Sequence, residues 1–348
     1  MQGGDRTVMN PYENGVIKYQ IDYERYKNGI ANEVIRLLDN ANIEIAGYIK
    51  KTQSVATKAR YKQIAKKLNE ISKQLKERIE QNIDVDAVIA YELKKEHNLF
   101  EKIKKVLKGD SGKISFIYPS VEQIKTSALF RPATDGLTFQ SYLDSIEAGL
   151  FNYWDSAVRT GYLTGIPTKQ IVSNVMGGVS QIDKLKKAGT IQPLRNAVYG
   201  NTRTLLQSFA EEARESVYRA NEDYFGDGEY KYERLGVLDN RQCIPCGVID
   251  GKLYRTIEEA QPVILHRNCR CILIAYFKIE GDKRASKNGY VDSKITFNEW
   301  LGDQDEKTQK EVLGATRYKM YKDGVKIEQF VDNGRLLTIE ELNQILDE

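Results

Sequence analysis

The residues of this chain best suited to chemistry are four cysteines and a histidine that lie close together. They are Cys243 and Cys246, followed by His266, Cys269 and Cys271, and they include every cysteine of the chain and one of its two histidines. Thiolate sulfur and imidazole nitrogen are the ligands of structural zinc sites, in which two ligand pairs close a tetrahedron around one ion. The spacing therefore predicts a metal-binding lobe.

Five candidate ligands compete for the four positions of a tetrahedral site. The Cys-x-x-Cys pair can reach one ion from a single turn, and Gly247 directly after it is expected to support that turn. We expect His266 and Cys269 to complete the set, because Cys269 and Cys271 would point to opposite faces of a regular strand. These two sulfurs can share an ion only if the chain bends there. The alternative is a pair of disulfides, formed after release into an oxidising medium.

The residue types favour a structural ion over a catalytic one. A cysteine-rich set that fills all four positions leaves none for a reacting water. His266 could act as a base, but the other histidine, His97, lies in a Lys- and Glu-rich segment and is expected at the surface. Asp239 is expected to cap the cysteine turn, and Arg270 to bond backbone carbonyls within the lobe. The sequence shows no phosphate-binding glycine loop, nucleophile elbow or HExxH motif. We therefore interpret the protein as non-enzymatic.

The composition is typical of a folded protein that works outside membranes. The chain has 348 residues, of which 41% are hydrophobic and 29% charged, enough for two or three domains with their own cores. The first residues carry charge and no apolar run follows, so we expect no signal peptide. No stretch approaches the ~20 apolar residues that cross a bilayer. We therefore expect synthesis in a cytoplasm, where clustered thiols stay reduced and bind metal.

Apolar residues at helical spacing predict long amphipathic helices between residues 17 and 108. The strictest stripe recurs every three or four residues. It consists of Tyr61, Ile64, Leu68, Ile71, Leu75 and Ile79. A weaker stripe ends at Leu107. Further helices are expected over residues 139–160, 169–176 and 191–224, and after the capping boxes that begin at Thr296 and Thr338.

Short strands are expected where apolar residues alternate or β-branched residues gather, at 114–118, 229–238, 263–265 and 271–277. The fold class is thus α+β and mainly α-helical, with long helices and a small β-rich, zinc-finger-like cysteine lobe. Four consecutive regions follow. They are an N-terminal amphipathic helical region (1–112), a central helical domain (113–228), the Cys/His β-rich lobe (229–280) and a C-terminal helical segment (281–348).

Charge is unevenly distributed along the chain. Residues 50–108 hold 16 Lys and Arg against 8 Asp and Glu, although the net charge of the whole chain is only +3. Such a surface can contact nucleic acid without sequence preference, or it can be the solvated side of a helix. The candidate DNA-contacting residues are Lys50, Lys51, Lys58, Arg60, Lys62, Lys66 and Lys67.

The cysteine segment resembles a known signature. The run 238–246 (Leu-Asp-Asn-Arg-Gln-Cys-Ile-Pro-Cys), then Asp250-Gly251, Pro262 and the run 266–271 (His-Arg-Asn-Cys-Arg-Cys), is similar to the motif of the phage Mu F-like head morphogenesis (minor head protein) family. The family has threonine where Gln242 stands here and proline where Arg267 stands. Neither position is a candidate ligand.

Other parts of the chain extend this resemblance to roughly residues 140–345. Thr202-Arg203-Thr204 is similar to the family's Arg-Thr-Glu sequence, with Thr204 in place of the acid. The tail from Phe297 to Gly324 looks like the segment that follows the cysteine lobe in many such proteins. The N-terminal helices have no counterpart in this comparison.

The resemblance implies a virion protein of a tailed phage. Such a protein is assembled in the host cytoplasm, is present in few copies and binds the portal vertex inside the capsid. It assists head assembly and DNA packaging or ejection. Its implied partners are the portal protein, the major capsid or scaffold protein, and viral DNA bound non-specifically. The alternative is an enzyme, either a metal-finger nuclease or a phage-delivered toxin-type domain. A scaffold whose helices self-assemble is a third interpretation.

Overall fold

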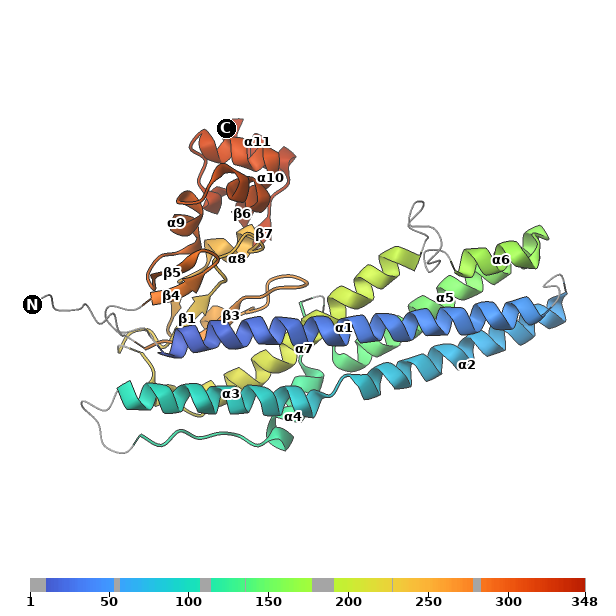
Figure 1. Ribbon diagram of the computed structural model, residues 1–348, viewed down its shortest axis with the longest axis horizontal. Helices are drawn as coiled ribbons and strands as arrows, with labels where there is room; N and C mark the ends of the chain where they lie inside the picture. The colour runs from blue at the N-terminus through green and yellow to red at the C-terminus, as the bar shows by residue number, and fades with distance from the viewer. Residues whose placement is uncertain are drawn as a thin grey trace, which may run out of the picture. The chain divides into compact units, whose positions relative to one another are not determined.

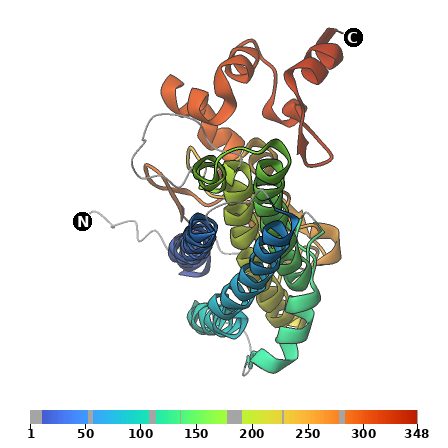
Figure 2. The ribbon, with the colours of Figure 1, turned by 90° about the vertical axis from the view of Figure 1, so that its right-hand side faces the viewer.

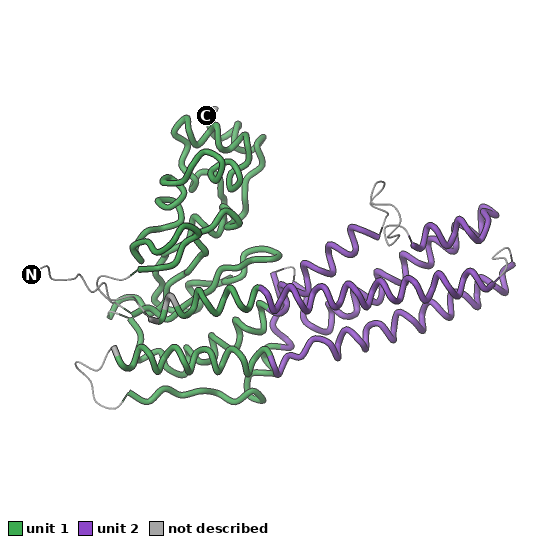
Figure 3. Tube along the Cα trace, viewed as in Figure 1, with its two compact units in different colours: residues 1–24, 88–128, 207–348 green, residues 25–87, 129–206 purple. Residues whose placement is uncertain are grey.

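The computed structural model describes residues 11–52, 57–106, 114–134, 136–176, 191–226, 228–277 and 283–347. The chain divides into two compact units, each made of segments that are distant in sequence (Figure 3). Unit 1 comprises Met1–Glu24, Val88–Ala128 and Gln207–Glu348, and unit 2 comprises Arg25–Ala87 and Leu129–Leu206. The predicted class, α+β and mainly helical, is confirmed. No helix in these described ranges is long and apolar enough to cross a membrane.

Four helices contribute residues to both units, so the units do not follow the order of the four predicted regions. They are α1 (Pro11–Lys51), α3 (Val85–Val106), α4 (Val121–Phe130) and α7 (Ile191–Arg219). The weaker predicted stripe is carried by α3, but Leu107 at its end lies outside the described residues.

Unit 2 is built around the helix pair α2 (Lys58–Asn82) and α5 (Phe139–Thr164), which lie side by side (Figures 1 and 2). The strict apolar stripe of α2 is buried from Ile64 to Ile79, as predicted. Thr57 and Thr138 cap the two helices, each accepting a hydrogen bond from the backbone amide three residues on. Burial of these two facing stripes forms the core of this unit.

Polar contacts inside unit 2 fix how its helices meet. Trp154 Nε1 donates to Asn42 Oδ1 at 2.6 Å, which joins α5 to α1. Lys76 of α2 forms ion pairs with Asp144 and Glu147 of α5. The helix α5 continues to Thr164, past its predicted end at residue 160, because Gly165 supplies the left-handed C-cap at φ 68°. The helix α6 (Thr168–Val175) follows.

Unit 1 contains a three-stranded antiparallel sheet in the order β2-β1-β3. Its strands are β1 (Tyr232–Leu235), β2 (Leu253–Tyr254) and β3 (Ile272–Ala275), with Tyr232 opposite both Tyr254 and Ala275. Aromatic rings pack edge-on in its core, as Tyr12 and Phe277 do at a centroid distance of 5.2 Å. The rings tie the start of α1 to the sheet.

Two predicted strands do not form, and in each case a side chain takes the hydrogen bonds that a partner strand would need. At 114–118, Ile117 N donates to Asn221 Oδ1 and Ile117 O accepts from Asn221 Nδ2, both at 2.7 Å. At 263–265, the carbonyls of Pro262 and Val263 accept from the buried Arg234 guanidinium. Neither segment belongs to a sheet, and these side-chain bonds satisfy backbone groups that a partner strand would otherwise pair with.

The chain beyond the cysteine lobe is less purely helical than expected. It contains α9 (Phe297–Gly302), α10 (Glu306–Lys322) and α11 (Ile339–Asp347), with a kink in α10 at Gly314. Two hairpins accompany these helices, formed by β4 (Lys283–Ser286) with β5 (Gly289–Asp292), and by β6 (Val331–Asp332) with β7 (Arg335–Leu336). Both predicted capping boxes form, at Thr296 and Thr338.

Short 3₁₀ turns complete unit 1. The helix α7 ends at Arg219 rather than 224, because the 3₁₀ turn η1 (Glu222–Tyr224) takes over. Two more 3₁₀ turns are η2 (Glu258–Ala260) and η3 (Ile327–Phe330). Glu259 N donates to Thr256 Oγ1, which caps the turn at η2.

Candidate metal centre

The first two candidate ligands lie at the start of the short helix α8 (Ile244–Val248). Cys243 is its N-cap residue, and the Cys243 carbonyl accepts a hydrogen bond from Gly247 N at 2.9 Å. Pro245 lies in the first turn, where a missing N–H costs no hydrogen bond. Cys246 follows one turn on, so its sulfur lies within 4.8 Å of Cys243 Sγ.

The other candidates lie in the turn that leads into β3. Cys269 N donates to His266 O at 3.1 Å, and Asn268 adopts a positive φ of 64°, which asparagine tolerates better than most residues. Cys269 and Cys271 therefore precede the strand instead of alternating within it. Both sulfurs lie within 4.8 Å of Cys246 Sγ. The bend required for these two cysteines to share an ion is present.

All five candidate ligand atoms are thus brought together, in two triplets that share Cys246. One triplet joins it to Cys243 and His266, and the other to Cys269 and Cys271. Cys246 Sγ lies 3.4 Å from His266 Nε2 and 3.5 Å from Cys269 Sγ. Tetrahedral zinc sets two sulfurs about 3.8 Å apart and a sulfur and a nitrogen about 3.6 Å apart. The cluster could therefore hold a metal ion, but Cys243 Sγ and His266 Nε2, which lie 2.7 Å apart, would have to separate for one ion to bind both.

Metal binding requires the ligands to lose their protons, and the groups of the cluster differ in this: the pKa values of Cys243 and Cys269 are lowered, whereas those of Cys246, Cys271 and His266 are raised. Hydrogen bonds from Cys246 and His266 lower the pKa of Cys243 to about 5. The bond to Cys243 raises the pKa of His266 to about 9. Cys243 Sγ and His266 Nε2 lie 2.7 Å apart, so each group favours the charged form of the other. His266 Nδ1 donates to Arg267 O at 2.8 Å, so a metal would take the place of the Nε2 proton.

The cluster is closed on most sides. Cys246, Cys269 and Cys271 are buried, whereas Cys243 and His266 are half-buried. Ile264 and Leu265 pack around the sulfurs. Thiols that are buried among apolar residues and already in contact leave little room for a substrate, which favours a structural ion.

Side chains around the sulfurs orient the ligands. Gln242 Nε2 donates to Cys271 Sγ at 3.5 Å, and Gln242 Oε1 accepts from Val237 N at 3.3 Å. Asp239 Oδ1 accepts from Arg241 N at 2.9 Å, which confirms its predicted role as a cap of the cysteine turn. The prediction for Arg270 was wrong: its guanidinium donates to the Asp239 carboxylate instead of to backbone carbonyls.

Gly247 has a role different from the one predicted for it. It lies inside α8, and a Cβ there would meet the Phe297 ring at 2.2 Å. The glycine therefore allows the cysteine helix to touch α9, where Phe297, Trp300 and Leu301 are buried together with Ile244 of the cysteine turn. This contact makes the cysteine lobe and the C-terminal helices one packed body within unit 1.

A buried ion pair next to the lobe was missed by the sequence analysis. Both oxygens of Asp250 accept hydrogen bonds from Arg284 at 3.1 Å. Asp250 also accepts from Gly236 N at 2.7 Å and Phe297 N at 2.8 Å. Asp250 and Gly251 belong to the motif that carries the resemblance, but only the positions of Arg284 and Phe297 show that the carboxylate joins four segments.

The candidate DNA-contacting residues lie on α1 and α2 of unit 2, and they are not equivalent. Lys67 forms ion pairs with Glu44 at 3.9 Å and Glu70 at 3.5 Å. Arg60 donates to the carbonyl of Thr52 at 3.1 Å. The other five are exposed and form no ion pair with a described residue. They are Lys50, Lys51, Lys58, Lys62 and Lys66.

His97 is exposed on α3, as predicted, and packs edge-on against Tyr118 at a centroid distance of 5.0 Å.

Comparisons of the chain with protein-family models, with curated proteins and with solved structures found no match.

Proposed function

We propose that the chain is a minor head protein of a tailed phage, in which one structural zinc ion holds a rigid lobe that docks on the portal protein. The observation that carries the proposal is the convergence of the motif residues. The cysteines and the histidine that resemble the head-morphogenesis signature meet around Cys246 at ligand distances. The motif residues are thus neighbours in space as well as in sequence, which supports the resemblance.

Zinc suits this ligand set better than other common ions. Four thiols and one imidazole are soft and borderline ligands, and calcium and magnesium prefer oxygen. A structural zinc ion would fix the α8 turn to the turn before β3. Because α8 also packs on α9, the ion would stiffen the surface formed by the C-terminal helices. A rigid surface loses little conformational entropy on docking.

A binding experiment tests the portal assignment. The full chain would be mixed with the portal protein encoded beside its gene, and the complex followed by size-exclusion chromatography with light scattering. The proposal expects a complex with wild type and a weaker one with Cys246→Ser. A folded, metal-loaded wild type that forms no complex contradicts it. Cleavage of plasmid DNA that is lost in His266→Ala would instead favour the nuclease alternative.

We propose DNA as a second partner, on the basis of the free lysines of α2. Lys58, Lys62 and Lys66 recur every fourth residue, so one face of the helix carries a positive charge about every 6 Å. Duplex DNA carries a negative charge for about every 1.7 Å of its axis. A row of lysines without acidic partners can therefore lie along the phosphates and release counterions.

A charge-matched pair of variants tests this contact. In the first, Lys58, Lys62 and Lys66 are all replaced by Glu. In the control, three exposed lysines of α3, at positions 94, 102 and 105, are replaced by Glu. We expect the first variant to lose DNA affinity, with the slope of log K against log salt reduced by about 3, and the control to bind as wild type does. Equal losses in both variants would mean that only net charge matters.

A further inference from the structure

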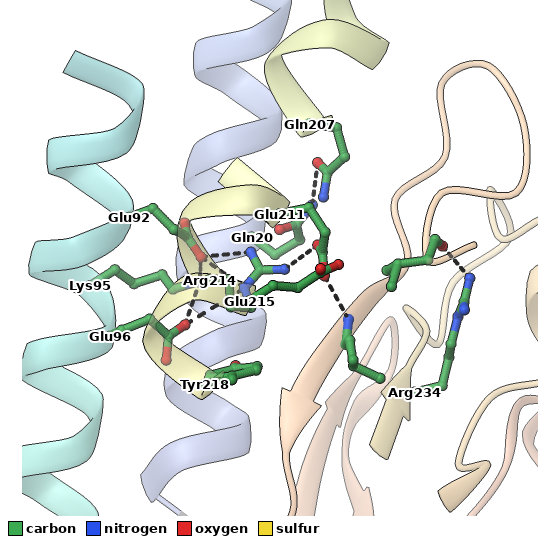
Figure 4. Close-up of polar contacts among 12 residues, drawn as sticks. Gln20, Glu92, Lys95, Glu96, Gln207, Glu211, Arg214, Glu215, Tyr218 and Arg234 are labelled. Carbon is green, nitrogen blue, oxygen red and sulfur yellow. Dashed lines mark hydrogen bonds and ion pairs between the residues drawn. The ribbon is translucent and has the colours of Figure 1, made fainter. Parts of the chain in front are cut away.

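Unit 1 contains a network of charged side chains that are buried where α1, α3 and α7 meet. Figure 4 shows Glu92, Lys95 and Glu96 on α3 facing Arg214 on α7. Each of these four side chains is at most 4% exposed. This part of α3 is rich in Lys and Glu, which predicts a solvated helix surface, so the burial is unexpected. Buried charges persist only where partners compensate them.

The two carboxylates on α3 are compensated unequally. Arg214 Nε donates to Glu92 Oε1 at 2.8 Å, and Arg214 Nη2 lies 2.7 Å from the same oxygen. Lys95 Nζ also donates to this oxygen of Glu92. Glu96 is 3.6 Å from Arg214 Nε and 3.0 Å from Lys95 Nζ. Both cations therefore lie closer to the carboxylate of Glu92 than to that of Glu96.

The hydrogen bonds of Glu96 are correspondingly poor. Its buried Oε1 atom is held only by the ion-pair contacts with Lys95 and Arg214, and no described residue donates a well-aligned hydrogen bond to it. Its Oε2 atom accepts a long one of 3.4 Å from the Tyr12 hydroxyl, which lies 2.7 Å from Tyr218 Oη. An ionised carboxylate in this position would be both under-bonded and one helical turn from a second negative charge, and each effect favours its neutral form.

Titratable groups from every neighbouring segment face Glu96. They are Glu92 and Lys95 of α3, Glu211, Arg214 and Tyr218 of α7, Tyr12 of α1, and Tyr118 before α4. Arg214 also neutralises a third carboxylate, because its Nη1 atom donates to Glu211 Oε2 at 2.5 Å. The strand β3 contributes two backbone amides to this network. Leu273 N donates to Glu211 Oε1, and Ala275 N donates to the Tyr12 hydroxyl.

We propose that Glu96 binds a proton in the folded protein and that this proton makes the packing of α1, α3 and α7 within unit 1 sensitive to pH. When Glu96 is protonated, Glu92 is the one negative charge on this part of α3, and Lys95 and Arg214 neutralise it. When the proton leaves, two like charges on consecutive turns share the same cations in a water-poor core. The inference depends neither on a bound metal nor on the phage assignment.

The direction of the pH effect follows from the pKa values. Burial raises the pKa of Glu96, whereas the pKa of Glu92 is lowered by Arg214 and Lys95 against the effect of its own burial. The folded state therefore binds more protons than the unfolded state between the ordinary pKa of glutamate and the raised pKa of Glu96. Stability from this group is full below that window and is lost as pH rises through it.

Infrared spectroscopy of the full chain detects the proton directly. Just above the ordinary pKa of glutamate, where other carboxyl groups ionise, the carbonyl band of a protonated carboxyl group should remain in wild type and be lost in Glu96→Gln. The control is Glu101→Gln on the same helix, whose side chain is 45% exposed. This control should keep the band. No band in wild type, or a band that survives in Glu96→Gln, would overturn the proposal.

A second variant guards against misfolding of the first. Glu92→Gln removes the like charge beside Glu96, so the carboxyl band should titrate away at lower pH than in wild type. In parallel, the unfolding equilibrium constant of wild type, measured with urea, should rise by up to tenfold per pH unit relative to Glu96→Gln across the window. An unchanged titration midpoint in Glu92→Gln, or equal pH slopes in wild type and Glu96→Gln, would also overturn it.

Discussion

Arg270 and Asp239 connect the two halves of the candidate metal centre. Arg270 lies between Cys269 and Cys271, Asp239 lies at the start of the turn that carries the other cysteines, and the guanidinium donates to both carboxylate oxygens at 2.8 and 2.7 Å. Both side chains are less than a quarter exposed. The two limbs that hold the sulfurs are thus joined by a bidentate ion pair as well as through any shared ion.

Replacing Asp239 by Asn should lower the free energy of unfolding by roughly 1.5–3 kcal/mol, because Arg270 loses its charged acceptor. The pKa of Asp239 is raised by burial but lowered more by Arg270. Its stabilisation is therefore present at neutral pH and is lost as pH falls through the lowered pKa. Urea unfolding at neutral and acid pH measures this. A wild type and a variant that differ equally at every pH would contradict the ion-pair interpretation.

Replacing Asp250 by Asn should destabilise the protein more, by about 3–5 kcal/mol, because Arg284 would then be a buried charge without a counterion. Both side chains are at most 1% exposed. The matched control is Asp332→Asn, an exposed position for which a change within about 0.5 kcal/mol is expected. Chemical denaturation of the three proteins gives the comparison, and similar values for both variants would argue against the pair.

Replacing Gly247 by Ala should separate the cysteine helix from α9, since the new Cβ would overlap the Phe297 ring. Overpacking of this kind costs about 1–3 kcal/mol. The control is Gly47→Ala in α1, where a Cβ meets no atom within 4 Å and helix propensity predicts a gain of roughly 0.4–1 kcal/mol. Opposite shifts in melting temperature are expected, and a neutral Gly247→Ala would refute the close contact.

Cys271→Ser and His266→Ala decide which four candidates bind the ion. We predict that Cys271→Ser keeps the metal, with its place beside Gln242 filled by a hydroxyl. His266→Ala should bind metal more weakly, because a ligand of the preferred set is removed. Competition with a chromophoric chelator measures both affinities. If the metal affinity falls in Cys271→Ser and is unchanged in His266→Ala, the four cysteines are the ligands.

The sequence predicted the elements whose pattern is local. The stripe from Ile64 to Ile79 repeats at helical spacing, and the capping boxes at Thr296 and Thr338 need only residues three apart. The five candidate ligands were found because their types are rare and they cluster in the chain. The choice among them depends on distances around Cys246, which no spacing rule supplies.

Features that depend on distant residues were missed. Glu92, Lys95 and Glu96 look solvated in sequence, and only the approach of Arg214 on another helix shows them to be buried. The two-residue strands β6 and β7 are too short to have a period. The 114–118 segment alternates like a strand, but Asn221, about a hundred residues later, takes its backbone hydrogen bonds.

The metal content of the full chain, purified without chelator, tests the central claim most directly. Elemental mass spectrometry and a thiol titration would be applied to wild type and to Cys246→Ser, the cysteine common to both ligand triplets. We expect one zinc ion for each wild-type chain and none in the variant, with loss of the folded lobe. Wild-type protein that is folded, holds no zinc and has all its thiols free to react would contradict it.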